Sequence, residues 1–241
     1  LRASGAEIVT DTDGDDGASP SRERPPAESL TPLAGRVLDV LVAHAYDLSS
    51  AVEAIDAAVP GVGGLFDPTT GRATLTTAVE QVLAAAATRP EQRAADASAP
   101  TPDAVVLYVD GSARSNPGPA GAGAVVQTAD GETLAELGRP VGSRADNNTA
   151  EYAALLLGLE YLARYIRPER VEVRIDSMTV IRDVWDGADG PDGVAKYREP
   201  IRTHLAALTA HEWTHLADGD PNPADALATV GADIAELGPG A

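Results

Sequence analysis

Two strand-like segments that each end in an aspartate, with a helix-patterned segment between them, constrain the fold most strongly. The apolar run 105–109 leads into Asp110, and the alternating segment 171–175 leads into Asp176. Between them, apolar residues recur at helical spacing from about residue 147 to about residue 165. In open α/β sheets, binding sites form where strands end. Both aspartates are therefore expected at one edge of a sheet.

The segments around this unit predict further strands and helices. Residues 125–128 and 134–138 are typical of strands, and Asp130-Gly131 between them is typical of a tight turn. With the first strand they predict an antiparallel meander. Helices are expected from Ser177 to about Trp185 and over residues 196–208. The chain is therefore expected to be an α/β protein.

The first hundred residues differ from the rest in composition and in sequence pattern. Residues 1–30 are rich in polar residues, glycine and proline, and we expect a disordered acidic tail. Residues 31–88 predict a small helical unit that opens with Thr31-Pro32, a capping residue followed by a proline at the first helical position. Residues 89–103 have the composition of a linker. Residues 104–241 would then form the second domain.

The chain is strongly acidic, with a net charge of −19 over 241 residues and Lys196 as its only lysine. Residues 1–103 hold 16 acidic and 7 basic residues, and residues 104–241 hold 21 and 11, so the acidity is not confined to a tail. Such a surface resembles proteins of salt-accumulating archaea, in which charge repulsion is screened within about 3 Å at 1 M salt. Acidity of this kind argues against nucleic-acid binding unless a specific site overcomes it.

Composition also limits the class and the compartment of the protein. The chain has no cysteine, so it has neither a disulfide framework nor a thiolate zinc site. No apolar run reaches the roughly 18–20 residues of a membrane helix. We therefore expect a cytoplasmic protein that does not contact a membrane, and we expect it to be a monomer.

A third carboxylate joins the two strand-end aspartates. Glu151 lies in the first turn of the helix predicted between the strands, where the helix dipole favours a negative charge. Three carboxylates that converge would repel one another if they were unpaired. Bound divalent cations best explain such a cluster of Asp110, Glu151 and Asp176.

These carboxylates and their neighbours resemble type 1 ribonuclease H, specifically a haloarchaeal member with an N-terminal extension. The resemblance covers residues 104–238. The matching segments are Asp110-Gly111-Ser112, Asn116-Pro117-Gly118-Pro119, Asn147-Asn148 with Glu151, Asp176-Ser177, and 222–228 with Asp225.

The resemblance implies a ribonuclease H-like fold, a five-stranded mixed sheet flanked by helices, here preceded by the helical N-terminal unit. It implies that Asp110, Glu151, Asp176 and Asp225 hold two Mg²⁺ or Mn²⁺ ions. The implied activity is endonucleolytic cleavage of the RNA strand of RNA–DNA hybrids, leaving 5′-phosphate and 3′-hydroxyl ends. The residues implied to contact the hybrid are Gly111, Ser112, Asn116, Asn147, Asn148 and Ser177.

The chain departs from the family pattern at several positions around the site. Met178 replaces a common glutamine, and Asp146 stands where a threonine that contacts phosphate is frequent. Asn222 lies three residues before Asp225 instead of four. The basic protrusion of the family is replaced by the short acidic segment 186–193. These departures affect how the substrate is gripped, not the four carboxylates.

A competing motif is His211-Glu212-Trp213-Thr214-His215, which matches the His-Glu-x-x-His pattern of zinc proteases. The zinc site needs a helix, whereas Trp213 and Thr214 favour a strand. On a strand the two histidines would lie about 13 Å apart, too far for one ion. His215 has two other interpretations, a mobile catalytic histidine as in some ribonucleases H or a strand-end residue that faces solvent.

Three alternatives to a ribonuclease H stay open at this point. A non-catalytic module that binds hybrids would not need all four carboxylates. An integrase or a junction resolvase shares the fold, although the Asn-Asn and Asn-Pro-Gly segments favour ribonuclease H. The zinc peptidase is the third alternative.

Overall fold

The computed structural model describes residues 26–27, 29–88, 102–186, 190–191, 193–217 and 219–238. Most of the predicted tail 1–30 and of the predicted linker 89–103 lies outside these residues. The acidic segment 186–193 lies partly outside them, and its described part contains no helix between α5 and α6.

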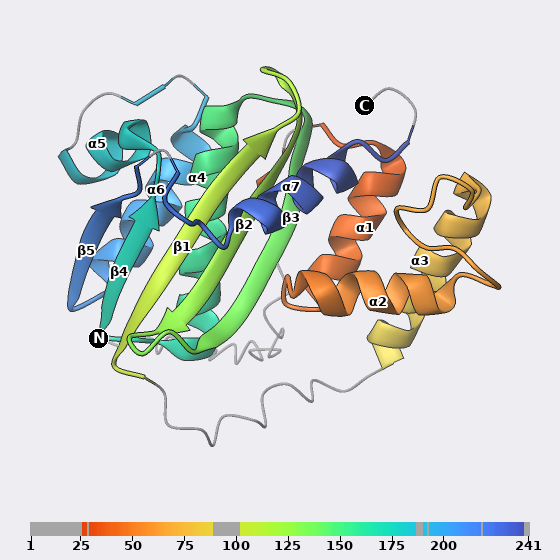
Figure 1. Cartoon of the computed structure of the whole chain (residues 1–241), viewed down its shortest axis with the longest axis horizontal. Coiled ribbons are helices and arrows are strands. Elements are labelled where there is room, and N and C mark those ends of the chain that lie inside the picture. The colour runs from red at the N-terminus through yellow and green to blue at the C-terminus, as the bar shows by residue number, and fades with distance from the viewer. Residues whose placement is uncertain are drawn as a thin grey trace, which may run out of the picture.

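The described residues form five strands in one sheet, with helices before, between and after them (Figure 1). The strands are β1 (Ala104–Ala113), β2 (Gly118–Thr128), β3 (Thr133–Ala145), β4 (Arg170–Ile175) and β5 (Ala210–His215). The α-helices are α1 (Pro32–Ala43), α2 (Leu48–Ala58), α3 (Arg72–Thr88), α4 (Asn147–Tyr161), α5 (Met178–Asp186), α6 (Ala195–Ala206) and α7 (Asp225–Ala235). A π-helical turn, η2 (Leu162–Ile166), extends α4.

The sheet is mixed, as the resemblance implied. Its strand order is β3-β2-β1-β4-β5, in which β1, β2 and β3 pair antiparallel and β1, β4 and β5 pair parallel. The parallel register sets Tyr108 beside Arg174, so Asp110 lies level with the residue that follows β4. Strand β1 does not end at Asp110 as predicted but continues to Ala113, because these residues pair with β2. The predicted strand–helix–strand unit is therefore confirmed, and it brings Asp110 and Asp176 to the same edge of the sheet.

Strands β2 and β3 are longer than the apolar pattern predicted. The added residues of β2 are mainly glycine and alanine, which have low strand propensity. They are nevertheless paired, because α7 lies directly on them. A Cβ on Gly121 or Gly123 would lie 2.1 Å or 2.2 Å from backbone atoms of residues 224–232. Small side chains here allow the close approach of α7, and tertiary packing overrides propensity.

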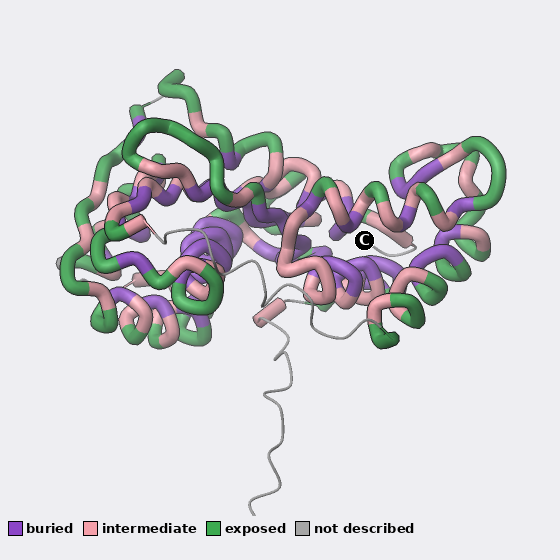
Figure 2. The backbone as a smooth tube through the Cα atoms, turned by 90° about the horizontal axis from the view of Figure 1, so that it is seen from below, coloured by how far each residue is buried: buried purple, intermediate pink, exposed green. Residues whose placement is uncertain are grey.

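Two helices sandwich the centre of the sheet. Helix α7 crosses one face over β1, β2 and β3, and α4 covers the opposite face (Figure 1). Every residue of α4 from 149 to 159 is buried, so this helix is enclosed on all sides by β1, β2 and α6, as the fully buried helix in Figure 2 shows. A helix that is apolar all round belongs in a core.

The helical unit packs against the edge strand β3 and against α7 (Figure 1). Thr31 caps α1 as predicted, and its side-chain oxygen accepts a bond from the Ala34 backbone N–H. Ile234 of α7 is fully buried in the core of the helical unit. The backbone N–H of Gly138 donates to the Tyr46 carbonyl at 3.0 Å, so the unit also covers part of the otherwise open edge of the sheet.

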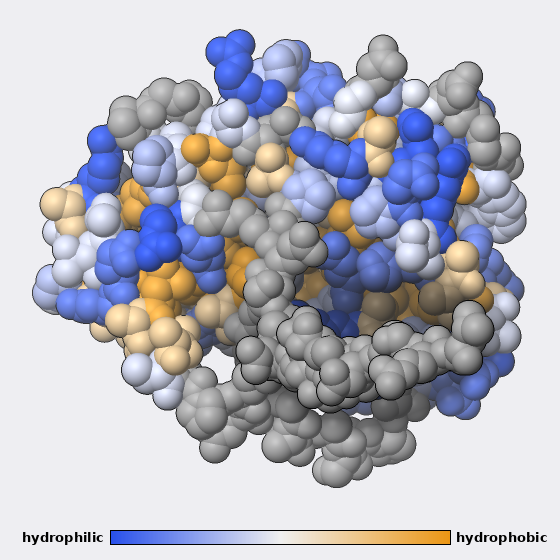
Figure 3. All heavy atoms as spheres, turned by 180° about the vertical axis from the view of Figure 1, so that it is seen from behind, coloured by the Kyte–Doolittle hydropathy of each residue, from blue (hydrophilic) through white to orange (hydrophobic). Residues whose placement is uncertain are grey.

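The small helical unit predicted over residues 31–88 is observed as α1, α2 and α3. The domain boundaries given above stay predictions. On the face opposite to Figure 1, hydrophilic residues surround smaller apolar areas (Figure 3). None of the helices in the described part of the chain is long and apolar enough to span a membrane.

Ile234→Ala tests whether the helical unit and α7 share one core. The substitution removes buried methyl groups between them, and we expect it to lower the free energy of unfolding by about 2–4 kcal/mol within a single transition. Chemical denaturation followed by circular dichroism measures this. Leu134→Ala, at a position that is 36% exposed, serves as the control. A loss no larger than the control's would show that the contact carries no stability.

Candidate metal centre

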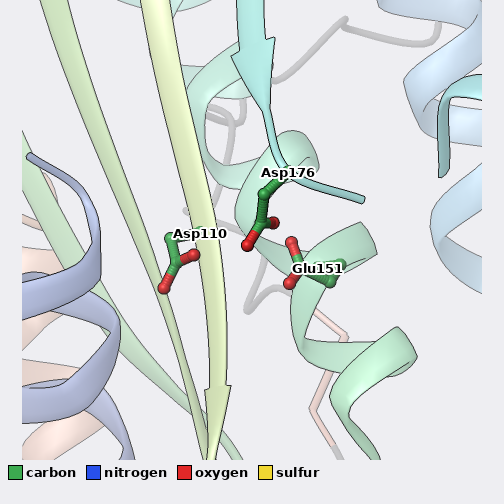
Figure 4. Close-up of side chains that lie close together, drawn as sticks. All are labelled: Asp110, Glu151 and Asp176. Carbon is green, nitrogen blue, oxygen red and sulfur yellow. The ribbon is translucent and has the colours of Figure 1, made fainter. Parts of the chain in front are cut away.

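Three carboxylates converge where β4 ends beside the C-terminal half of β1, which continues three residues beyond Asp110. Asp110 lies on β1, Asp176 follows β4 directly, and Glu151 lies just after the first turn of α4, not within it as predicted (Figure 4). One ligand oxygen of each residue lies within 4.8 Å of those of the other two. The predicted convergence of these three residues is therefore observed.

The N-terminal part of α4, at residues 150–151, can approach β1 only because residue 111 is a glycine. A Cβ on Gly111 would lie 2.3 Å from the backbone nitrogen of Glu151 and 2.5 Å from the carbonyl carbon of Ala150. Real Cβ atoms do not come so close, so any other residue would push α4 away from the strand. The Asp146 side chain caps this helix by accepting from the Thr149 N–H at 2.7 Å. The local sequence thus fixes the position of Glu151 relative to Asp110.

Burial makes this cluster electrostatically unfavourable as it stands. Burial raises the pKa of Asp110 to about 7, and the charges of Asp176 and Asp225 add to the rise. Burial also raises the pKa of Glu151 well above its ordinary value, again with help from Asp110 and Asp176. The Gly111 backbone N–H and the Asn147 side chain act in the opposite direction on that pKa.

One oxygen of Glu151 has no partner in this environment. Oε1 accepts from Asn147 Nδ2 at 3.4 Å, whereas Oε2 is buried without a hydrogen bond. Buried polar atoms are nearly always satisfied, and an unsatisfied one calls for an explanation. A divalent cation would satisfy Oε2 and offset the repulsion among the three carboxylates, and oxygen donors are the ligands that Mg²⁺ and Mn²⁺ prefer. The residues present therefore fit a divalent metal.

Asp225, the predicted fourth ligand, lies nearby but outside the group of three. It is exposed at the start of α7, and its charge reaches Asp110, whose pKa it raises. Its backbone N–H donates to the Asn222 carbonyl at 3.2 Å. Asn222 in turn donates from Nδ2 to the Val109 carbonyl at 3.0 Å, which ties the start of α7 to β1.

The anchoring role of Asn222 was not predicted from the sequence. Its Oδ1 accepts from the Ala224 N–H at 3.1 Å, the side-chain turn that asparagine commonly forms before a helix. The Asn222-Pro223 pair before an apolar helix was the signal available for that turn. Its contact with β1, more than a hundred residues earlier in the chain, had no local signal.

His215 is the last residue of β5, and its ring contacts the backbone beside the site. Nε2 lies 3.0 Å from the Asp176 carbonyl oxygen, which can only accept, so Nε2 carries the hydrogen. The side chain is exposed. The expected position at a strand end is confirmed, and the catalytic role of His215 stays a prediction.

The zinc-protease interpretation of His211 and His215 is excluded by the fold. Both lie on strand β5, as the residue preferences indicated, with His211 near its start and His215 at its end. His211 Nδ1 accepts a hydrogen bond from the Trp213 indole N–H at 3.1 Å, and His215 takes no part in that bond. A strand of this length keeps the two rings too far apart for one ion.

The residues predicted to contact a substrate lie on or next to the elements that carry the carboxylates, and they differ in their hydrogen bonds within the protein. The Asn147 backbone N–H donates to Asn116 Oδ1 at 3.3 Å, which joins the β1–β2 turn to the start of α4. Ser177 Oγ accepts from the Val180 N–H at 3.4 Å at the start of α5. Ser112 lies on β1 and Asn148 on α4, both partly exposed. Their contacts with a substrate stay predictions.

Comparisons with known proteins agree with this fold. The profile of the family described as reverse transcriptase-like matches residues 108–231, just over half of the chain. Ribonuclease HI of Halobacterium salinarum is 39% identical over 134 residues, which cover 54% of this chain and 65% of that protein. Ribonuclease H of Albidiferax ferrireducens is 30% identical over 151 residues, covering 55% of this chain and 97% of that protein.

Two solved structures share the architecture. RNase H1 from Halobacterium salinarum has a TM-score of 0.50 at 36% identity, and the match covers 54% of this chain and 98% of that one. The N-terminal RNase H domain of a Mycobacterium tuberculosis protein has a TM-score of 0.51 at 32% identity, with coverages of 55% and 96%. The chain spans less than two thirds of the length of the full Halobacterium protein.

The fold and the site thus define a domain of the reverse transcriptase-like class. Within that class the chain belongs to the type 1 ribonuclease H family. The family profile begins at residue 108, so the helical unit lies outside the matched part.

The pKa of Asp110 predicts how the metal-free protein depends on pH. An aspartate titrates near 3.9 in the unfolded chain and near 7 here, so the folded state binds its proton more tightly. This contribution to stability is complete below about pH 4 and is lost as the pH rises through 7. In EDTA, the free energy of unfolding of Asp110→Asn should therefore exceed that of the native protein by an amount that grows from pH 5 to pH 8. At the upper end of this range the difference should be about 2–4 kcal/mol.

Thermal melting in EDTA across this pH range measures the difference. Asp130→Asn, which removes a carboxylate from an exposed turn, controls for the lower net charge. If the gain of Asp110→Asn did not change with pH, Asp110 would not be held in a repulsive, buried cluster.

Proposed function

We propose that this chain is a ribonuclease H that cuts the RNA strand of RNA–DNA hybrids with the help of bound divalent cations. The observation that carries the proposal is the convergence of Asp110, Glu151 and Asp176, with the unpartnered Oε2 of Glu151, at the strand ends of a ribonuclease H fold. Such an arrangement is costly without a cation.

Asp110, Glu151 and Asp176 would hold the cations, and Asp225, at the start of α7, would complete the set. We infer two ions, Mg²⁺ or Mn²⁺. When bound, such ions lower the pKa of an attacking water and stabilise charge on the leaving oxygen of a phosphodiester. The products would carry 5′-phosphate and 3′-hydroxyl ends.

The chain's own groups orient these carboxylates and the substrate. Asn147 Nδ2 donates to Glu151 Oε1, and the missing side chain at Gly111 lets residues 150–151 of α4 lie against β1. Asn116 accepts from the start of α4 through Oδ1, which leaves its Nδ2 hydrogens to donate to a nucleic-acid groove. The other residues proposed to contact the hybrid are Gly111, Ser112, Asn147, Asn148 and Ser177. Contacts with 2′-hydroxyl groups would distinguish the RNA strand.

The acidic surface is compatible with a polyanionic substrate only under particular conditions. At high ionic strength, repulsion between the surface and phosphates is screened within a few ångströms, about 3 Å at 1 M salt. Binding would then rest on the cations and on short hydrogen bonds, not on a basic patch. We propose on this basis that the protein works in high salt, as its likeness to a Halobacterium protein also supports.

Cleavage of a strand-labelled RNA–DNA hybrid tests the function. We expect RNA-strand cleavage with Mg²⁺ or Mn²⁺ but not with EDTA, and extension of the upstream fragment by a polymerase would reveal its 3′-hydroxyl. Asp110→Asn should lower the rate by at least about a hundredfold, since a metal ligand is lost, whereas Asp130→Asn should keep the native rate. The reaction with Zn²⁺ completes the series of metals.

Each other outcome contradicts the proposal in a different way. Binding of the hybrid without cleavage would indicate a non-catalytic module. Cleavage of branched or double-stranded DNA in preference to hybrids would indicate another nuclease of the same fold. Cleavage that persisted in Asp110→Asn would exclude the carboxylate site.

A further inference from the structure

A buried carboxylate joins three helices next to the metal centre. Asp183 of α5 is only 1% exposed. Its Oδ2 accepts from the Tyr152 hydroxyl at 2.5 Å and from Arg198 Nε at 2.7 Å. Arg202 Nη2 donates to the Asp183 carbonyl at 2.9 Å and lies 3.6 Å from Oδ1. Tyr152 belongs to α4 and both arginines belong to α6, so Asp183 is bonded to both neighbouring helices.

The chain that leads into α6 covers the Asp183 end of this network, whereas the two arginine side chains reach solvent in part. A Cβ on Gly190 would lie 2.1 Å from Asp183 Oδ2 and 2.4 Å from Arg198 Nη2, so the backbone at Gly190 lies directly over the ion pair. The Tyr152 side chain is fully buried. Hydrogen bonds to a charged acceptor are stronger than neutral ones, and a low local dielectric strengthens them further. The Oδ2 atom of Asp183 therefore connects the helices through two charge-assisted hydrogen bonds, while its Oδ1 is buried without a hydrogen bond.

One end of this connection adjoins Glu151 in the chain, and the other lies on the helix that follows Asp176. Tyr152 directly follows Glu151 in the first turns of α4. Helix α5, which carries Asp183, begins at Met178, two residues after Asp176. The bond between Tyr152 and Asp183 therefore joins the helix turn that holds Glu151 to the helix that follows Asp176.

We propose that Asp183 is a positioning residue that holds Glu151 and Asp176 at the separation a divalent cation requires. The inference rests on the proposed metal-dependent function of the site. It assigns a role to a buried ion pair that the reaction itself does not use. A purely stabilising ion pair would lower the melting temperature without changing the affinity of the folded protein for a metal.

Mn²⁺ binding to the full chain, followed by electron paramagnetic resonance of the free ion, distinguishes the two roles without measuring activity. Asp183→Asn should raise the Kd for Mn²⁺ about tenfold, as is common when a group that supports metal ligands is lost. Tyr152→Phe removes only the hydroxyl and should raise this Kd by a smaller factor. The double variant should bind no more weakly than Asp183→Asn, since both changes break the same contact.

Glu80→Gln is the matched control, because it removes a carboxylate from an ion pair with Arg36 on the helical unit. Its Kd should equal that of the native chain. Circular dichroism confirms that each variant is folded at the temperature of the titration, and Tyr152→Phe keeps the test valid if Asp183→Asn does not fold.

The outcomes separate the inference from the proposed function. Native binding of Mn²⁺ together with a Kd within twofold of native in Tyr152→Phe and in every folded Asp183→Asn sample would overturn the positioning role and leave the metal site intact. Failure of the native chain to bind Mn²⁺ would overturn the proposed metal-dependent function itself.

Discussion

The close approach of α4 to β1 at Gly111 is the contact on which the site depends. Because Gly111 has no side chain, the backbone of residues 150–151 lies directly against the strand. This contact sets Glu151 beside Asp110, and the parallel pairing of β1 with β4 adds Asp176. The absence of a side chain at residue 111 therefore decides whether the three carboxylates can lie close together.

The resulting cluster is unfavourable in isolation, and the rest of the fold restrains it. Helix α7 lies on the glycine-rich stretch of β2 and brings Asp225 near Asp110. The helical unit packs on the other side of α7 through Ile234, so it supports the element that carries Asp225. The strain is electrostatic, since burial and like charges raise the pKa values of Asp110 and Glu151. Bound cations are what such a site is built to hold.

Local patterns predicted the elements and the three carboxylates, but not how tightly the elements pack. Strand-end positions and helical spacing were sufficient for Asp110, Asp176 and Glu151, because each signal lies within a few residues of the chain. The packing role of Gly111 depends on a contact with residues about forty positions later, which a single sequence does not reveal. The full length of β2 was missed for a similar reason, since α7 determines it. The buried network at Asp183 had no signal beyond ordinary helical residues.

The affinity of Gly111→Ala for Mn²⁺ tests the central claim most directly. Gly35→Ala is the matched control, because a Cβ at that helical position meets nothing within 4 Å. The account predicts a folded Gly111→Ala protein whose Mn²⁺ Kd rises at least about tenfold, while Gly35→Ala binds like the native chain. Native affinity in Gly111→Ala would contradict the account, because the cluster would then form without the close contact between α4 and β1.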